Sequence, residues 1–176
     1  MALTSGQLAG GSVPNWQSVA SNSSLSGLST ITFSGLTGYS KYRILAGGLV
    51  AASGTTQLRI NADSAANYNL VVPTVYNPTN APYSAPTVTL GATGIPLGNQ
   101  AGTAPTFDVQ IDNALLLTPK GIVGWGEDVG TAANAASGAA VGVINGLYVT
   151  ASAITSISIV RTANFTSGTI YLLGAN

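Results

Sequence analysis

The side chains that could do chemistry in this chain are few. It has five lysine or arginine residues, five aspartate or glutamate residues, and no histidine or cysteine. Histidine and cysteine supply many of the nucleophiles, general bases and metal ligands of proteins. A serine hydrolase needs a base to take the hydroxyl proton, and neither Lys41 nor Lys120 stands in a Ser-x-x-Lys context. We therefore expect that the chain is not an enzyme.

The acidic side chains offer two further kinds of chemistry, glycoside hydrolysis and cation binding. Asp108 and Asp112 fall on one face of an expected strand, about 13 Å apart at a rise of about 3.3 Å per residue. Glycosidase carboxylates lie about 5–9.5 Å apart. Asp63, Glu127 and Asp128 could meet across strands or offer hard oxygen ligands, but their spacing follows no ligand motif. We expect no cofactor and no metal site.

Three aromatic residues are candidate contacts for a sugar or a partner protein. Tyr76 and Tyr83 stand in the segment PTVYNPTNAPYSAP, residues 73–86, and Trp125 stands between two glycines. A tyrosine on a stiff loop offers a flat face at low entropic cost. The alternative interpretation is that these rings close the ends of the domain or lie in a subunit interface.

The scarcity of charge is itself informative. Charged residues make up 6% of the chain and its net charge is zero, whereas an average soluble domain is about 25% charged. With so little charge to keep copies apart in solution, much of the surface is expected to face other protein. The alternative is a Ser/Thr-rich extracellular domain that hydroxyls and amides keep soluble.

The same composition argues against several other classes. Five scattered cations form no basic patch, so nucleic-acid binding is not expected. The N-terminal residues lack the cationic start and apolar run of a signal peptide. Residues 129–160 carry no charge, but their Ser, Thr and Asn residues and the alternation at Val141 and Val143 favour strand over a membrane span.

The pattern along the chain predicts an all-β fold. Twenty-two glycines, eight prolines and many Thr, Val and Ile residues indicate short strands with tight turns, and no capped helical segment is found. Nine strands are expected, over residues 30–34, 41–51, 55–61, 87–91, 106–117, 121–125, 141–150, 153–160 and 169–174. This spacing is typical of an antiparallel β-sandwich or jelly roll. No fixed-period repeat supports an ice-binding solenoid.

The domain organisation follows from composition. Residues 1–28 are charge-free and of low complexity, which predicts an extended N-terminal arm, and residues 29–176 form the β-sandwich domain. Residues 131–140 are expected to be loop. Residues 41–51 and 55–61 flank a Ser53–Gly54 turn and are expected to form a hairpin.

Alternation and turn residues predict which side chains have structural roles. Phe107, Val109 and Ile111 should point inward, and Thr56, Leu58 and Ile60 should share one face of their strand. Asn61 and Asp63 are expected to bond their own backbone two residues on, with Tyr68 buried against the same turn. Asn164 and Gly168 should bracket a hairpin connection, after which the last strand ties the C-terminus into a sheet.

Two segments resemble a known family. Residues 57–69, QLRINADSAANYN, are similar to a Leu-x-x-x-Phe-Asn-Gly-Asp-x-Gly-x-Asn-Tyr turn that recurs in tailed-phage virion proteins, with Leu58, Asn61, Asp63, Asn67 and Tyr68 at matching positions. Residues 154–176 resemble the C-terminal strands of the same proteins. The matching residues there are Asn164, Phe165, Gly168 and Gly174. Ala62 and Ala66 replace the usual glycines, and Leu173 stands where tyrosine is common.

The resemblance implies a structural protein of a phage virion, with a β-sandwich module that is often trimeric. It implies as partners other copies of the chain and virion proteins such as the major capsid protein. Small size, the lack of a long stalk and the charge-free arm favour a capsid decoration or cement protein that stabilises the head shell. The alternative is a tail-fibre or baseplate protein that binds host surface glycans through Tyr76 and Tyr83. A lytic enzyme is disfavoured for lack of a base.

Overall fold

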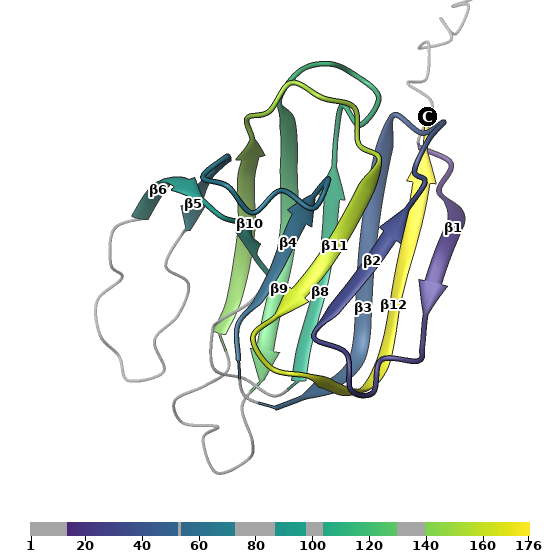
Figure 1. Ribbon diagram of the computed structural model, residues 1–176, viewed down its shortest axis with the longest axis vertical. Helices are drawn as coiled ribbons and strands as arrows, with labels where there is room; N and C mark the ends of the chain where they lie inside the picture. Colours follow the sequence, from purple (N-terminus) through teal and green to yellow (C-terminus); the bar gives the residue numbers. More distant parts are fainter. Residues whose placement is uncertain (1–13, 53, 73–86, 98–103, 130–139) are drawn as a thin grey trace, which may run out of the picture.

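The computed structural model describes residues 14–52, 54–72, 87–97, 104–129 and 140–176 (Figure 1). Within these residues the chain contains no helix. It forms twelve strands: β1 (Gln17–Asn22), β2 (Thr30–Ser34), β3 (Lys41–Ala51), β4 (Thr56–Ile60), β5 (Tyr68–Val72), β6 (Thr87–Ala92), β7 (Ile95–Pro96), β8 (Ala104–Ile111), β9 (Lys120–Val129), β10 (Ala140–Tyr148), β11 (Ser156–Arg161) and β12 (Phe165–Ala175).

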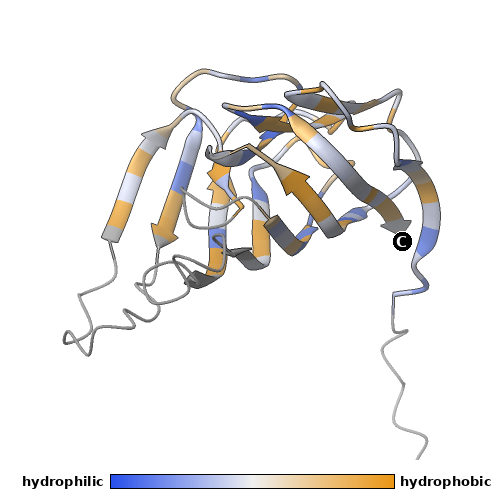
Figure 2. Cartoon of the chain, turned by 90° about the horizontal axis from the view of Figure 1, so that it is seen from below, coloured by the Kyte–Doolittle hydropathy of each residue, from blue (hydrophilic) through white to orange (hydrophobic). Residues whose placement is uncertain are grey.

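The strands form two antiparallel sheets. The large sheet has the order β1-β12-β3-β8-β9-β10-β5-β6, and the small sheet has the order β2-β11-β4-β7. The small sheet lies across one face of the large one (Figure 1). Figure 2, turned to show the two layers from below, shows hydrophobic segments alternating with hydrophilic ones along the strands. The expected all-β, antiparallel two-sheet class is confirmed.

The core lies between the sheets and follows the predicted alternation. Along β8, Phe107, Val109 and Ile111 are buried, and the residues between them are only partly so. Along β4, Leu58 and Ile60 are buried with Thr56. Because successive side chains of a strand point to opposite faces, these strands contribute one apolar row each to the same core. The inward face predicted for β8 and the shared face predicted for β4 are both confirmed.

Twelve strands replace the nine expected. The nine predicted segments correspond to β2, β3, β4, β6 and β8 to β12, and β1, β5 and β7 are additional. β7 has only two residues, Ile95–Pro96, too few for alternation to be visible. β1, QSVASN, lacks an apolar row, and its side chains are at most half-buried. The three additional strands are defined by pairing with a neighbouring strand. Their own amino-acid composition therefore does not predict them.

The two predicted hairpins are wrong. β3 lies in the large sheet and β4 in the small one, and likewise β12 lies in the large sheet and β11 in the small one. The connections across residues 52–55 and 162–164 therefore cross from one layer to the other. Each of these strands has one apolar face, and the faces meet in the core from opposite sides, which burial favours over edge-to-edge pairing.

The expected N-terminal arm, residues 1–28, is described from residue 14 onward. Residues Gln17–Asn22 pair with β12, and Leu25 is fully buried in the core. This part of the segment therefore belongs to the sandwich, and the expected boundary at residue 28 does not separate an arm from it. The predicted loops at residues 73–86 and 131–139 lie outside the described residues, together with Tyr76 and Tyr83.

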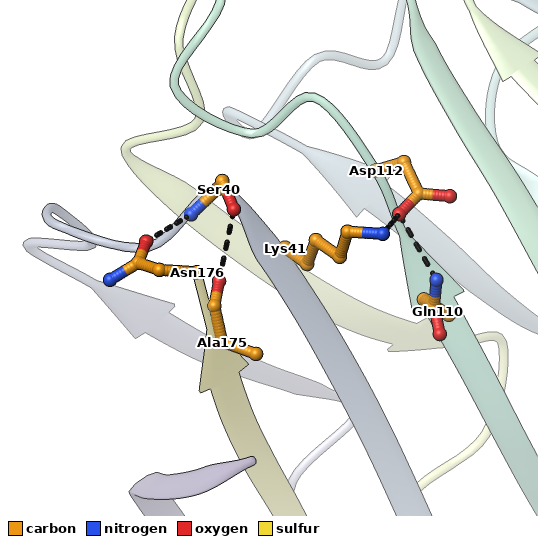
Figure 3. Close-up of polar contacts among 6 residues, drawn as sticks. All are labelled: Ser40, Lys41, Gln110, Asp112, Ala175 and Asn176. Carbon is orange, nitrogen blue, oxygen red and sulfur yellow. Dashed lines mark hydrogen bonds and ion pairs between the residues drawn. The ribbon is translucent and has the colours of Figure 1, made fainter. Parts of the chain in front are cut away.

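The C-terminus is tied into the large sheet, as predicted. β12 pairs with β1 on one side and β3 on the other. At its end, the Ser40 N–H donates to Asn176 Oδ1 at 2.9 Å and the Ser40 hydroxyl donates to the Ala175 carbonyl at 3.2 Å (Figure 3). The next residue, Lys41, pairs with Asp112 at 3.2 Å. The start of β3 thus holds the last residues of the chain.

Candidate functional site

The turn after β4 is built around the Asp63 carboxylate. Asn61 and Ala62 both have positive φ, 54° and 55°, and the Asp63 N–H closes the turn on the Ile60 carbonyl at 3.0 Å. One carboxylate oxygen accepts the Ala65 N–H at 2.8 Å, which confirms the predicted local bond. The other accepts from the Asn67 amide at 2.8 Å.

A third donor to Asp63 comes from β10. The Tyr148 hydroxyl donates to the Asp63 carboxylate at 3.0 Å. Burial opposes ionisation of this carboxylate, but the bonds from Asn67, Ala65 and Tyr148 outweigh it, so the pKa of Asp63 lies below its ordinary value. The Asp63 carboxylate accepts hydrogen bonds from three donors of its own chain. Its role in the turn is therefore structural.

Asn61 does not make the expected local bond. Its side-chain oxygen accepts the Thr155 N–H at 2.7 Å and the Ser156 N–H at 3.1 Å, and its amide donates to the Ala153 carbonyl at 2.8 Å. Its backbone N–H donates to the Ser156 carbonyl at 2.9 Å. Asn61 therefore joins the β4–β5 turn to the segment that enters β11.

Tyr68 is buried against this turn, as predicted. Its hydroxyl accepts the Ile60 N–H at 2.8 Å and donates to the Asp63 carbonyl at 3.1 Å. Its ring lies 5.0 Å from that of Tyr148, centroid to centroid. Burial raises the pKa of both hydroxyls. Sequence reasoning missed Tyr148, because no local pattern relates it to a turn 85 residues earlier in the chain.

The other predicted turn group lies at the opposite end of β11. The Phe165 ring is buried, and its N–H donates to the Leu28 carbonyl at 2.8 Å. The Asn164 carbonyl accepts the Ala52 N–H at 3.3 Å. Gly168 lies inside β12 at an irregularity in its pairing with β3, with φ of 111°, and a Cβ there would lie 2.6 Å from the Leu49 Cα. These residues position β12 and do not meet the Asp63 turn.

The charged side chains that the structure describes are used internally. Arg43 and Asp108 form a two-pronged ion pair across β3 and β8, with 2.7 Å from Nε to Oδ1, and the Trp16 ring lies 6.0 Å from the guanidinium. Asp112 forms an ion pair with Lys41 and accepts a hydrogen bond from the Gln110 amide (Figure 3). Arg59 donates to the Thr93 carbonyl, and Arg161 to the Ala52 carbonyl and the Thr56 hydroxyl. None of these pairs forms a catalytic carboxylate arrangement.

Lys120 is a fully buried lysine that shapes a turn. Its ammonium donates to the Leu116 carbonyl at 2.6 Å and to the Thr118 carbonyl, and desolvation lowers its pKa. Residues 112–117 were expected to continue a strand, but β8 ends at Ile111 and Asn113 has a φ of 62°. The turn exposes three consecutive leucines, Leu115, Leu116 and Leu117.

Trp125, the third aromatic candidate, lies on the outer face of β9, where 41% of it is exposed. It pairs across strands with Asp108 on β8 and with Val143 on β10. Further exposed apolar side chains follow on the same side of the sheet. We call this surface the apolar face, and it consists of Val71, Val88, Leu90, Val123, Trp125, Val143 and Leu147.

Within the described residues, no three acidic side chains gather as a metal site would need, and no helix long and apolar enough to cross a membrane is found among them. A comparison of the chain with protein-family models, with curated proteins and with solved structures finds no match. Among the described residues, the apolar face is the candidate functional site.

Proposed function

We propose that this chain is a non-enzymatic structural protein of a phage virion, and within the virion a capsid decoration protein that stabilises the head shell. The observation that carries the proposal is the difference between the charged and the apolar side chains in what they contact. The described charged groups make contacts within the chain, such as Arg43–Asp108, whereas large apolar side chains such as Trp125 are exposed. A surface of this kind works by contact with other protein.

The fold supports this role in a second way. The chain moves between the two sheets at most connections, which fits the jelly-roll-like description expected from the sequence. The resemblance of residues 57–69 and 154–176 to phage virion proteins falls on turns that hold the sandwich together. As a decoration protein the chain would act as a homotrimer and bind the major capsid protein on the particle.

The experiment that tests this function is the copy number of the chain in purified virions, by quantitative mass spectrometry against the major capsid protein. If the chain decorates the head, we expect a copy number close to that of the major capsid protein. A few copies per particle would overturn the head assignment. Removal of residues 1–13, which leaves β1 in place, should also weaken binding to undecorated heads. Full decoration by the truncated chain would exclude a role for that segment.

The second candidate function is glycan binding at a tail fibre or baseplate. It is favoured by Trp125, whose half-exposed ring lies between Gly124 and Gly126 on an open sheet face. Aromatic faces of this kind stack on sugar rings. Trp125→Ala, and separately the double variant Tyr76→Ala with Tyr83→Ala, should abolish adsorption to host cells while leaving the fold intact. Unchanged adsorption of both variants would exclude this function.

A further inference from the structure

Two features coincide at one end of the large sheet. Among the residues that the structure describes, β6 is the last strand of the sheet and pairs with β5 alone. It contains no charged residue and no proline, two of the devices that keep a free edge from pairing with another chain, although its pairing with β5 has one irregularity. Figure 1 shows β5 and β6 at the side of the molecule, away from β2 and β11 of the small sheet.

The apolar face adjoins this edge and is interrupted by one exposed polar residue, Asn145. The register places Val123, Asn145, Val71 and Val88 in one row across β9, β10, β5 and β6. Trp125 and Val143 form the next row. Leu147 lies two residues from Asn145 and Leu90 two from Val88, so both share this side of the sheet.

The size of this face matches what an interface between proteins needs. Its seven apolar side chains are between 38% and 72% exposed. Residues of these sizes leave an area on the order of 600 Å², at the upper limit of the roughly 300–600 Å² that a typical monomer exposes. A standard interface takes about 800 Å² from each partner, so this face with the adjoining β6 edge supplies most of one.

We propose that the apolar face and the β6 edge form the contact between two copies of this chain, which names one partner of the proposed virion protein and in that sense rests on the proposed function. A second copy fits the chemistry of the surface. The seven side chains of the apolar face carry no charge, so two copies can meet there without repulsion between like charges in the face. Asp108, the cross-strand neighbour of Trp125, is already paired with Arg43, so the partner need not supply a counter-charge for it.

Sedimentation velocity on the full chain, from about 1 to 100 µM, tests this contact. The wild type should form a defined oligomer. Val143→Asp places a charge at the centre of the face and should weaken association by at least about tenfold. Val50→Asp is the matched control, because Val50 is a similarly exposed strand valine, 47% against 54%, on β3 outside the face. The control should associate like the wild type.

Three results would overturn the proposal. One is a wild-type chain that stays monomeric over the whole range. Another is equal weakening by Val143→Asp and Val50→Asp. Val88→Asp, at the sheet edge, replaces Val143→Asp if thermal melting shows that the latter does not fold. The third result that would overturn the proposal is unchanged association of the Val88→Asp variant. A monomeric chain that still decorates heads would overturn this contact and leave the proposed function standing. A chain that forms the oligomer but does not bind heads would overturn the proposed function and leave this contact standing.

Discussion

The side-chain oxygen of Asn61 accepts the backbone N–H of Thr155 at 2.7 Å, although the two residues are 94 positions apart in the chain. This bond fastens the turn that leaves β4 to the segment that enters β11, the neighbour of β4 in the small sheet. A residue expected to shape only its own turn therefore aligns two strands.

Replacement of Asn61 by alanine should be costly for this reason. The variant loses the bonds to Thr155, Ser156 and Ala153 and places alanine at positive φ. We expect a loss of about 2–4 kcal/mol in the free energy of unfolding, measured in urea. Asn113→Ala is the control, since Asn113 also has positive φ, 62°, with an exposed side chain. It should lose only about 1 kcal/mol, and equal losses would contradict the role of Asn61.

Asp63 should make stability depend on pH. Its pKa is lower in the folded chain than the unfolded value of about 3.9. The stabilisation is therefore complete above about pH 4 and is lost as the pH falls through the folded pKa. Urea midpoints measured at pH 7 and pH 3 should fall further for the wild type than for Asp63→Asn. Tyr148→Phe removes one donor and should reduce the same pH dependence. Parallel pH profiles for all three chains would refute this role.

Two buried tyrosines should respond oppositely to loss of the hydroxyl. The Tyr42 hydroxyl is buried and has no hydrogen-bond partner among the described residues, and burial raises its pKa. Tyr42→Phe should leave stability unchanged or raise it. The Tyr68 hydroxyl accepts the Ile60 N–H and donates to the Asp63 carbonyl. Tyr68→Phe should therefore lower the free energy of unfolding by about 1–3 kcal/mol. Denaturant unfolding of the two variants side by side provides the comparison, and a larger loss for Tyr42→Phe would reverse the assignment.

Deletion of residues 169–176 should abolish the fold. The deletion removes the part of β12 that lies between β1 and β3, with the buried side chains of Ile170 and Leu172. We expect loss of the cooperative thermal transition. Deletion of Asn176 alone removes one side-chain bond to Ser40 and should cost only about 1 kcal/mol. A truncated chain that melts like the full one would show that β12 is dispensable.

Alternation was sufficient to predict the inward face of β8 and the shared face of β4, because the period of two in residues such as Val109 and Leu58 reflects burial on one side of a strand. It could not show the sheet in which a strand lies. β3 and β4 looked like a hairpin because they are adjacent in the chain and both alternate, yet they line opposite sides of the core.

The candidate site was predictable only in part. Trp125 stood out among glycines, but Val71, Val88 and Val143 are ordinary strand residues until the pairing of β5, β6 and β10 places them side by side. The Asp63 turn shows the same limit. Asn67 and Tyr68 are local and were predicted, whereas Tyr148 reaches the carboxylate from a strand 85 residues away.

The crossing of the chain between layers has a kinetic consequence. Every strand of the small sheet has neighbours in the chain that belong to the large sheet, so none of its pairings is local. The hydroxyls of Thr32 and Ser158, which join β2 to β11, are 126 residues apart. Chains dominated by such distant pairings fold in roughly milliseconds to seconds. β2 and β4 both pair with β11, so the small sheet cannot form before β11 has been synthesised.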